Sequence, residues 1–226
     1  MSHVKVTLPA DGAASAKGYF GFLEVSDDAA APPPRGEASR DLPEAVDAAV
    51  TYLLGACTQA GRWLDYDGFT EGAADEWVTA YVAHALHESG RSRATQAVSL
   101  AWRALARRER AGWGWNFLQP ADADSTTWGL RLAADLDQLE SAPARDAIAF
   151  LRRHVHGDGG VATYLRDIHS EWSGGAQINA GWFEAHACVT AAAAQLDCLG
   201  PAPLDYLRRA QHPDGTWGGY WWESQA

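Results

Sequence analysis

An internal repeat constrains this sequence more than any other feature. The segment Leu151–Tyr164 (LRRHVHGDGGVATY) aligns without a gap with Leu207–Tyr220 (LRRAQHPDGTWGGY). A diverged copy covers Leu105–Phe117, and a weaker one starts at Tyr52. Each copy is an amphipathic stretch that ends in a turn rich in Gly, Asp and Trp. Such self-similarity is typical of repeat architectures, in which each unit buries its apolar face against the next.

A second helical segment follows each of the first three turns. These segments are Glu76–Leu86, Thr126–Leu136 and His186–Leu196, and they are rich in small residues, as expected for helices packed on most sides. The repeating unit is therefore an outer helix, a loop and an inner helix. The sequence predicts an all-α fold of about three and a half helical hairpins, in which the fourth inner helix is missing.

The first forty residues differ from the remainder of the chain. Val4–Leu8 reads as a short strand, and three consecutive prolines within residues 27–37 favour an extended linker over a helix. We therefore predict two parts, an N-terminal extension with a Pro/Ala linker over residues 1–40 and a repeat domain over residues 41–226.

Composition excludes several classes of function. A net charge of -11 disfavours binding to nucleic acid, because no basic patch offsets it. No stretch approaches the roughly 18 to 20 apolar residues of a membrane span, and the N-terminus lacks the pattern of a signal peptide. Cys57, Cys188 and Cys198 form no CxxC pair, which argues against a disulfide framework. These features predict a soluble, cytoplasmic protein.

Two motifs resemble those of a known superfamily. Gln211–Trp217 (QHPDGTW) is similar to the QW motif of squalene/oxidosqualene cyclases, and Asp122–Thr126 (DADST) is similar to the Asp-x-Asp-Asp-Thr box of class II terpene cyclases. The resemblance implies an α/α toroid of the squalene cyclase and protein prenyltransferase β-subunit superfamily, here as an incomplete ring. It further implies an isomerase or lyase that cyclises an isoprenoid or a similar apolar substrate.

The same resemblance implies roles for the two aspartates. Asp124 matches the proton donor of the box and Asp122 matches its partner, whereas Ser125 replaces the last acidic residue. Two neighbouring carboxylates raise each other's pKa, which a general acid requires. The alternative is that both aspartates only cap a helix, since Asp-Ser-Thr before an apolar helix is a typical N-cap.

Three inner helices start with polar residues at one end of the bundle. In the alignment made from the sequence, Glu76, Thr126 and His186 are equivalent, so that Glu76, Asp124 and His186 converge as candidate catalytic residues. The alternative is that acidic residues simply favour helix N-termini.

Aromatic side chains near these helix starts are candidates for stabilising a cation in the cavity. They can equally brace one hairpin against the next, and the alignment makes Trp115 equivalent to Trp217 in such a role. The candidate substrate-binding residues are Trp77, Tyr81, Trp115, Trp128 and Trp182.

Two other functions remain open. Asp124, His186 and Cys188 lie approximately where prenyltransferase β-subunits hold zinc, although Thr126 occupies the position of the required cysteine. The expected cofactor is none, with zinc as the alternative. The third possibility is a non-catalytic toroid that binds an apolar ligand or a partner protein. Because a carbocation must be sheltered from water, an active form is expected to associate with a second copy or a second chain that completes the ring.

Overall fold

The computed structural model describes residues 41–65, 72–166 and 180–219, and these residues are helical apart from their loops. The helices are α1 (Leu42–Ala56), α2 (Glu76–Glu88), α3 (Thr95–Leu105), α4 (Ala123–Asp135), α5 (Ala142–Arg152), α6 (Ala187–Ala193) and α7 (Ala202–Ala210). Within these ranges the only β-structure is isolated bridges. The expected strand and linker of residues 1–40 lie outside the described part.

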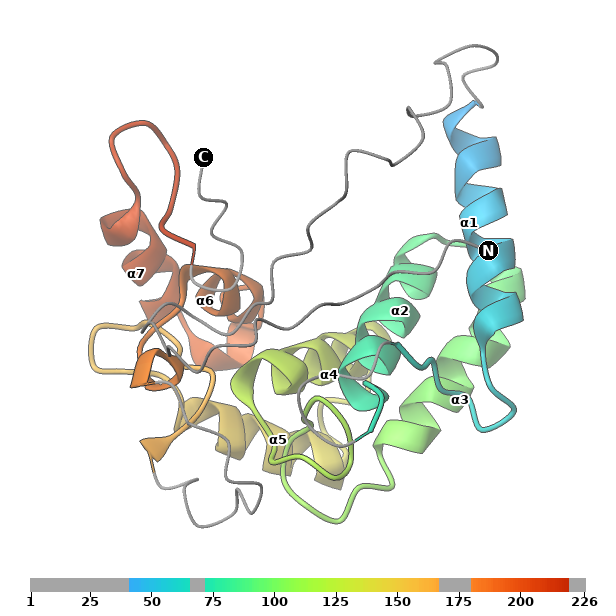
Figure 1. Ribbon diagram of the computed structural model, residues 1–226, viewed down its shortest axis with the longest axis horizontal. Helices are drawn as coiled ribbons and strands as arrows, with labels where there is room; N and C mark the ends of the chain where they lie inside the picture. The colour runs from blue at the N-terminus through green and yellow to red at the C-terminus, as the bar shows by residue number, and fades with distance from the viewer. Residues whose placement is uncertain (1–40, 66–71, 167–179, 220–226) are drawn as a thin grey trace, which may run out of the picture. The chain divides into compact units, whose positions relative to one another are not determined.

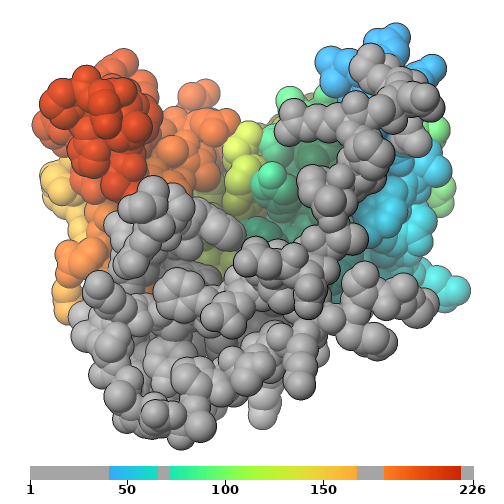
Figure 2. Space-filling view, turned by 45° about the horizontal axis from the view of Figure 1, so that its top comes forward, coloured from blue at the N-terminus to red at the C-terminus, as the bar shows by residue number. Residues whose placement is uncertain are grey.

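The helices alternate between two layers, as the repeat predicts. The inner helices α2, α4 and α6 pack side by side, while α3, α5 and α7 pack on them from outside. Figure 1 shows α1 and α7 at opposite sides of the helical repeats, with α2 and α4 between them. The same order, from blue through green to red, is visible in the space-filling view of Figure 2. No helix in the described ranges is long and apolar enough to cross a membrane.

Small residues let the inner helices pack closely. Ala80 and Ala83 of α2 and Ala133 of α4 are completely or almost completely buried. Gly129 of α4 lies so close to Trp113 that a Cβ atom there would be 2.3 Å from the indole ring. The Ala- and Gly-rich composition of these segments therefore follows from close packing on several sides.

Three tryptophans brace the end of an outer helix against the following loop. The indole N–H groups of Trp63, Trp113 and Trp217 donate to leucine carbonyl oxygens at 2.7, 3.0 and 2.8 Å. The accepting leucines are Leu53, Leu105 and Leu207. The brace recurs in three of the four repeats, which accounts for part of the high tryptophan content.

The expected equivalence of Trp115 and Trp217 is wrong. The bracing tryptophan follows its leucine by 10 residues in the first and fourth repeats but by 8 in the second, where it is Trp113. The second loop is shorter, and an alignment without gaps therefore selects Trp115 instead. Trp113, and not Trp115, therefore makes the bracing contact in the second repeat.

Candidate functional site

A threonine in each inner helix binds the loop that precedes that helix. The Oγ1 atoms of Thr79, Thr126 and Thr190 accept hydrogen bonds from backbone N–H groups at 3.0, 3.0 and 2.9 Å. The donors belong to Trp63, Trp113 and Val161. Because the contact is the same in all three repeats, the threonines define the structural register of the inner helices.

This register corrects the alignment made from the sequence. The N-cap residues of α2, α4 and α6 are Asp75, Asp122 and His186, which are therefore the equivalent positions. Glu76 lies one position beyond its N-cap and is not equivalent to Thr126 or His186. The loops before these helices differ in sequence and length, so local pattern alone could not fix the offset.

Asp122 and Asp124 have different roles at the start of α4. Asp122 is the N-cap, and its Oδ1 accepts the backbone N–H of Ser125 at 2.7 Å while its Oδ2 accepts the Ser125 hydroxyl at 2.8 Å. Asp124 lies in the first turn of α4 and accepts a hydrogen bond from the Trp128 side chain. Helix capping therefore explains the position of Asp122. Asp124 makes no capping contact among the described residues, so capping does not explain it.

Both carboxyl groups are held in a protonation range suited to acid chemistry. Burial and the neighbouring Asp124 raise the pKa of Asp122 to about 7, against the opposing effect of the Ser125 hydrogen bonds. Burial raises the pKa of Asp124 to about 6, although the Trp128 hydrogen bond favours its charged form. Because the two groups interact, they titrate as a pair, and a proton is retained near neutral pH.

A nearly continuous line of aromatic rings leads to Asp124. Trp115 stacks on Trp77 at 5.8 Å between ring centroids, Trp77 stacks on Tyr81 at 6.0 Å, and Tyr81 meets Trp128 edge-on at 4.6 Å. Four of the five candidate aromatic residues are therefore brought together, and Trp128 joins them to the Asp124 carboxyl group.

Trp182 is placed apart from this line. Its ring packs against Tyr164 at 5.6 Å, and Phe183 belongs to the same small apolar cluster. Burial raises the pKa of the Tyr164 phenol, and the Asp122 and Asp124 carboxylates raise it further, which places this cluster within electrostatic reach of the two acids. Tyr164 is a site residue that the sequence pattern did not single out.

Glu76 is occupied in an ion pair. Its buried carboxylate pairs with Arg108 and its Oε2 accepts the backbone N–H of Gly114 at 2.9 Å. These contacts link α2 to the loop between α3 and α4. They support a structural role for Glu76.

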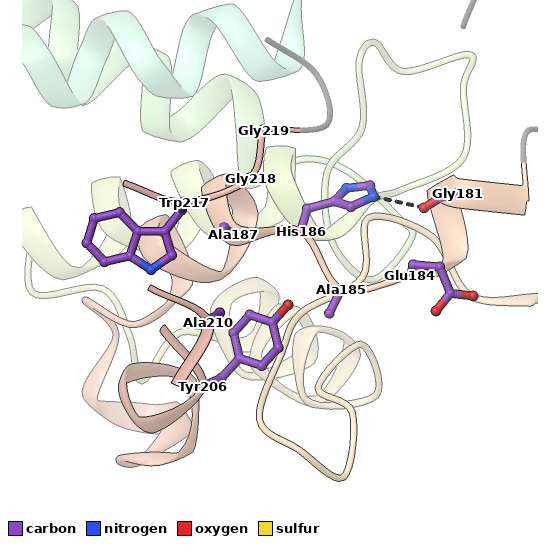
Figure 3. A pocket seen from close by; sticks show the side chains of 10 residues that line it. All are labelled: Gly181, Glu184, Ala185, His186, Ala187, Tyr206, Ala210, Trp217, Gly218 and Gly219. Atoms are coloured by element: carbon purple, nitrogen blue, oxygen red, sulfur yellow. Dashed lines mark hydrogen bonds between the residues drawn. The ribbon is translucent and has the colours of Figure 1, made fainter. Parts of the chain in front are cut away.

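His186 uses both ring nitrogens to hold neighbouring loops. Nε2 lies 2.8 Å from the Gly181 carbonyl oxygen (Figure 3). Nδ1 lies 3.0 Å from the Thr163 hydroxyl. A carbonyl can only accept, so Nε2 carries the proton and Nδ1 accepts from Thr163. Burial lowers the pKa of His186, which favours this neutral form. His186 also lines a groove of about 320 Å³ with Tyr206 and Trp217, whereas Glu76 lines a different cavity.

The three residues considered for zinc are not arranged as a ligand set. Within the described ranges, the only group of three His, Cys, Asp or Glu residues with ligand atoms within 4.8 Å of one another is His84, Glu88 and Asp135. Both nitrogens of His186 already have hydrogen-bond partners. Desolvation and Asp124 raise the pKa of the Cys188 thiol, which opposes the thiolate that zinc requires.

A polar cluster that the sequence analysis did not find lies further along α2 and α4. Arg131 donates from Nη2 to His84 Nε2 at 2.9 Å, so that His84 Nδ1 donates to Asp135 at 2.6 Å. The Arg131 guanidinium also lies 4.5 Å from the Trp128 ring centroid. The spacing Asp124, Trp128, Arg131 and Asp135 on one face of α4 is the signal that could have revealed this cluster.

Comparisons with solved structures identify proteins with a similar fold. No family model matches the sequence, and no curated protein matches it either. Among solved structures, a variant of the type II terpene cyclase MstE from Scytonema, in complex with its substrate geranylgeranyl dihydroxybenzoate, matches with 34% identity and a TM-score of 0.71. This match covers 79% of the chain and 53% of MstE.

Two further structures agree. Apo MstE from Scytonema matches with 35% identity and a TM-score of 0.72, over 79% of this chain and 54% of that one. A protein from Actinoplanes matches with 38% identity and a TM-score of 0.73, over 80% of this chain and 56% of that one. The chain thus spans about half the length of the structures it matches. It has the α/α repeat fold of the class II terpene cyclases.

Proposed function

We propose that this chain carries the proton-donating part of a class II terpene cyclase site and that Asp124 is the proton donor. The observation that carries the proposal is the pair formed by the buried Asp122 and the partly exposed Asp124, which is linked through Trp128 to a line of aromatic rings. The likeness to MstE, which acts on geranylgeranyl dihydroxybenzoate, supports an isoprenoid substrate of the same general kind.

The reaction begins with proton transfer from the Asp124 carboxyl group to an alkene carbon. A new C–H bond forms there, the π electrons of a second alkene attack the resulting cation, and a C–C bond closes a ring. Loss of a proton from the last cation gives a product that is an isomer of the substrate. The retained proton of the acid pair makes the first step possible near neutral pH.

The aromatic residues stabilise the cation between these steps. The π-faces of Trp77, Tyr81 and Trp115 offer negative electrostatic potential without a nucleophile that would trap a carbocation. Trp128 also orients the acid, because its indole N–H binds the Asp124 carboxylate. Asp122 retains its cap, and its own pKa is raised by burial and by the neighbouring Asp124, whereas burial raises the pKa of Asp124.

Turnover is expected to decrease with rising pH because only the protonated acid initiates the reaction. With pKa values of about 6 and about 7 in the pair, the rate is highest on the acidic side and falls roughly tenfold per unit above about pH 7. The measurement is a pH profile of turnover of a geranylgeranyl aryl carboxylate by the full chain. A rate that rises steadily through pH 8 contradicts a carboxylic acid as the proton donor.

Association with a second copy or a second chain stays a prediction. Native mass spectrometry of the purified protein during turnover tests it, and a strictly monomeric species that cyclises the substrate contradicts it. The same spectrum reports bound zinc, whose loss on His186→Ala would support the prenyltransferase alternative. Ligand binding without any turnover would support the non-catalytic alternative.

A further inference from the structure

Four arginines line one cavity of a strongly acidic protein. The cavity has a volume of about 570 Å³ and is lined by Arg62 from the loop before α2 and by Arg107, Arg108 and Arg110 from the loop after α3. The acidic lining residues are Glu76 and Glu109. Such a concentration of guanidinium groups is notable in a chain with a net charge of -11.

Part of this positive charge is already neutralised. Arg62 pairs with Asp75 at 2.5 Å, and Arg108 pairs with Glu76. Arg110 donates from Nη2 to the Phe117 carbonyl oxygen at 2.7 Å. Arg107 is exposed and has no ion-pair or hydrogen-bond partner within the described part of the chain. The cavity therefore retains free guanidinium donors beside its internal ion pairs.

The buried Arg108 provides an independent observation. Its side chain is 7% exposed, and although Nη2 donates to the Gln119 carbonyl oxygen at 3.1 Å, its Nε has no hydrogen-bond partner among the described residues. An unpaired N–H of a charged group is costly to bury. Burial, with a smaller contribution from the nearby Arg110, lowers the pKa of Arg108 to about 10, so its charged form is poorly solvated in this place. An anion in the cavity would relieve both costs.

We propose that this cavity binds a phosphate-class anion. Converging guanidinium groups suit phosphate because their planar N–H forks match its oxygens and because its charge exceeds that of a single carboxylate. Phe117 also lines the cavity and is 57% exposed, so it offers apolar surface to the organic part of a phosphoester. The cavity is not lined by Asp124 or by the aromatic line, and the proposal does not depend on the proposed cyclase chemistry.

Isothermal titration calorimetry of the full chain with inorganic pyrophosphate tests this site. Saturable binding that weakens with added NaCl is expected for wild type. Arg107→Gln is expected to weaken binding by about tenfold, the effect of losing one charge-assisted hydrogen bond. Arg103→Gln is the matched control, since Arg103 is an exposed arginine of α3 outside the cavity, and it is expected to change the affinity by less than about twofold.

A second variant, which is expected to change the affinity in the opposite direction, distinguishes loss of the binding site from loss of the fold. Glu109→Gln removes a negative charge from the cavity and is expected to tighten pyrophosphate binding, whereas a general disturbance would weaken it. Phenyl phosphate distinguishes the two sources of the anion. If phenyl phosphate binds more tightly than inorganic phosphate and Phe117→Ala removes this difference, the ligand is a phosphoester. If the two bind equally, the ligand is the free anion. Absence of pyrophosphate binding, or equal losses from Arg103→Gln and Arg107→Gln, would overturn the proposal.

Discussion

Replacing Asp124 by asparagine is expected to lower turnover of an isoprenoid substrate by about 10²- to 10⁴-fold, the contribution of a general acid to the rate. Asparagine preserves the shape of the side chain and can still accept the Trp128 hydrogen bond, but it has no proton to give to an alkene. The measurement is single-turnover product formation with saturating substrate. Residual activity within about tenfold of wild type would contradict the assignment of Asp124.

Two controls separate chemistry from folding. Asp122→Asn keeps the cap, since an amide oxygen can accept the Ser125 N–H, and it is expected to cost less activity than Asp124→Asn. The second control is thermal unfolding. The folded pKa of Asp124, about 6, exceeds the ordinary aspartate value of 3.8, so ionisation destabilises the folded state as the pH rises through this range. Asp124→Asn is therefore expected to stabilise the protein at pH 8 by about 1–3 kcal/mol and to lose that advantage below about pH 4.

Replacing Trp113 by alanine is expected to reduce the free energy of unfolding by about 3–5 kcal/mol, the usual cost of emptying a large buried aromatic site. The Trp113 side chain is 1% exposed, touches Trp102 and lies against Gly129, and its indole donates to Leu105. Its backbone N–H also binds Thr126, in the first turns of the helix that carries Asp124. Urea unfolding followed by far-UV circular dichroism measures the change.

Trp217 provides the matched control for this prediction. It makes the same indole hydrogen bond to an outer helix, at 2.8 Å, but is 43% exposed. Trp217→Ala is therefore expected to cost about 1–2 kcal/mol, because less apolar area returns to water and one hydrogen bond is lost. Equal destabilisation by the two substitutions would show that the hydrogen bond, and not the packing, is what the brace contributes.

The fold could be predicted from the sequence because each repeat predicts the same pair of helices. Small residues at inner positions and the recurring Gly/Asp/Trp turns indicated alternating outer and inner helices, and the inner helices begin within three residues of where they were expected. The register between repeats was not recoverable. It depends on the contacts of Thr79, Thr126 and Thr190 with loops of different length, which an alignment without gaps cannot represent.

The candidate site was predictable in part for the same reason. The local motif Asp122–Thr126 identifies Asp122 and Asp124. Both lie at the start of α4, so their proximity is determined by the sequence around them. Glu76 and His186 are candidates because they lie at helix starts, but their partners, Arg108 and Thr163, come from other segments of the chain. Those contacts occupy both side chains, and nothing in the sequence near Glu76 or His186 indicates them.

Proton transfer from Asp124 to the substrate is the central claim, and deuterium labelling tests it most directly. In D₂O the acid pair exchanges its proton for deuterium before it reacts. The cyclised product is therefore expected to carry one deuterium at the carbon where cyclisation begins, and Asp124→Asn is expected to form this labelled product at least about a hundredfold more slowly. Mass spectrometry and NMR of the product locate the label. Cyclised product without deuterium, or labelled product from Asp124→Asn at the wild-type rate, would contradict the account.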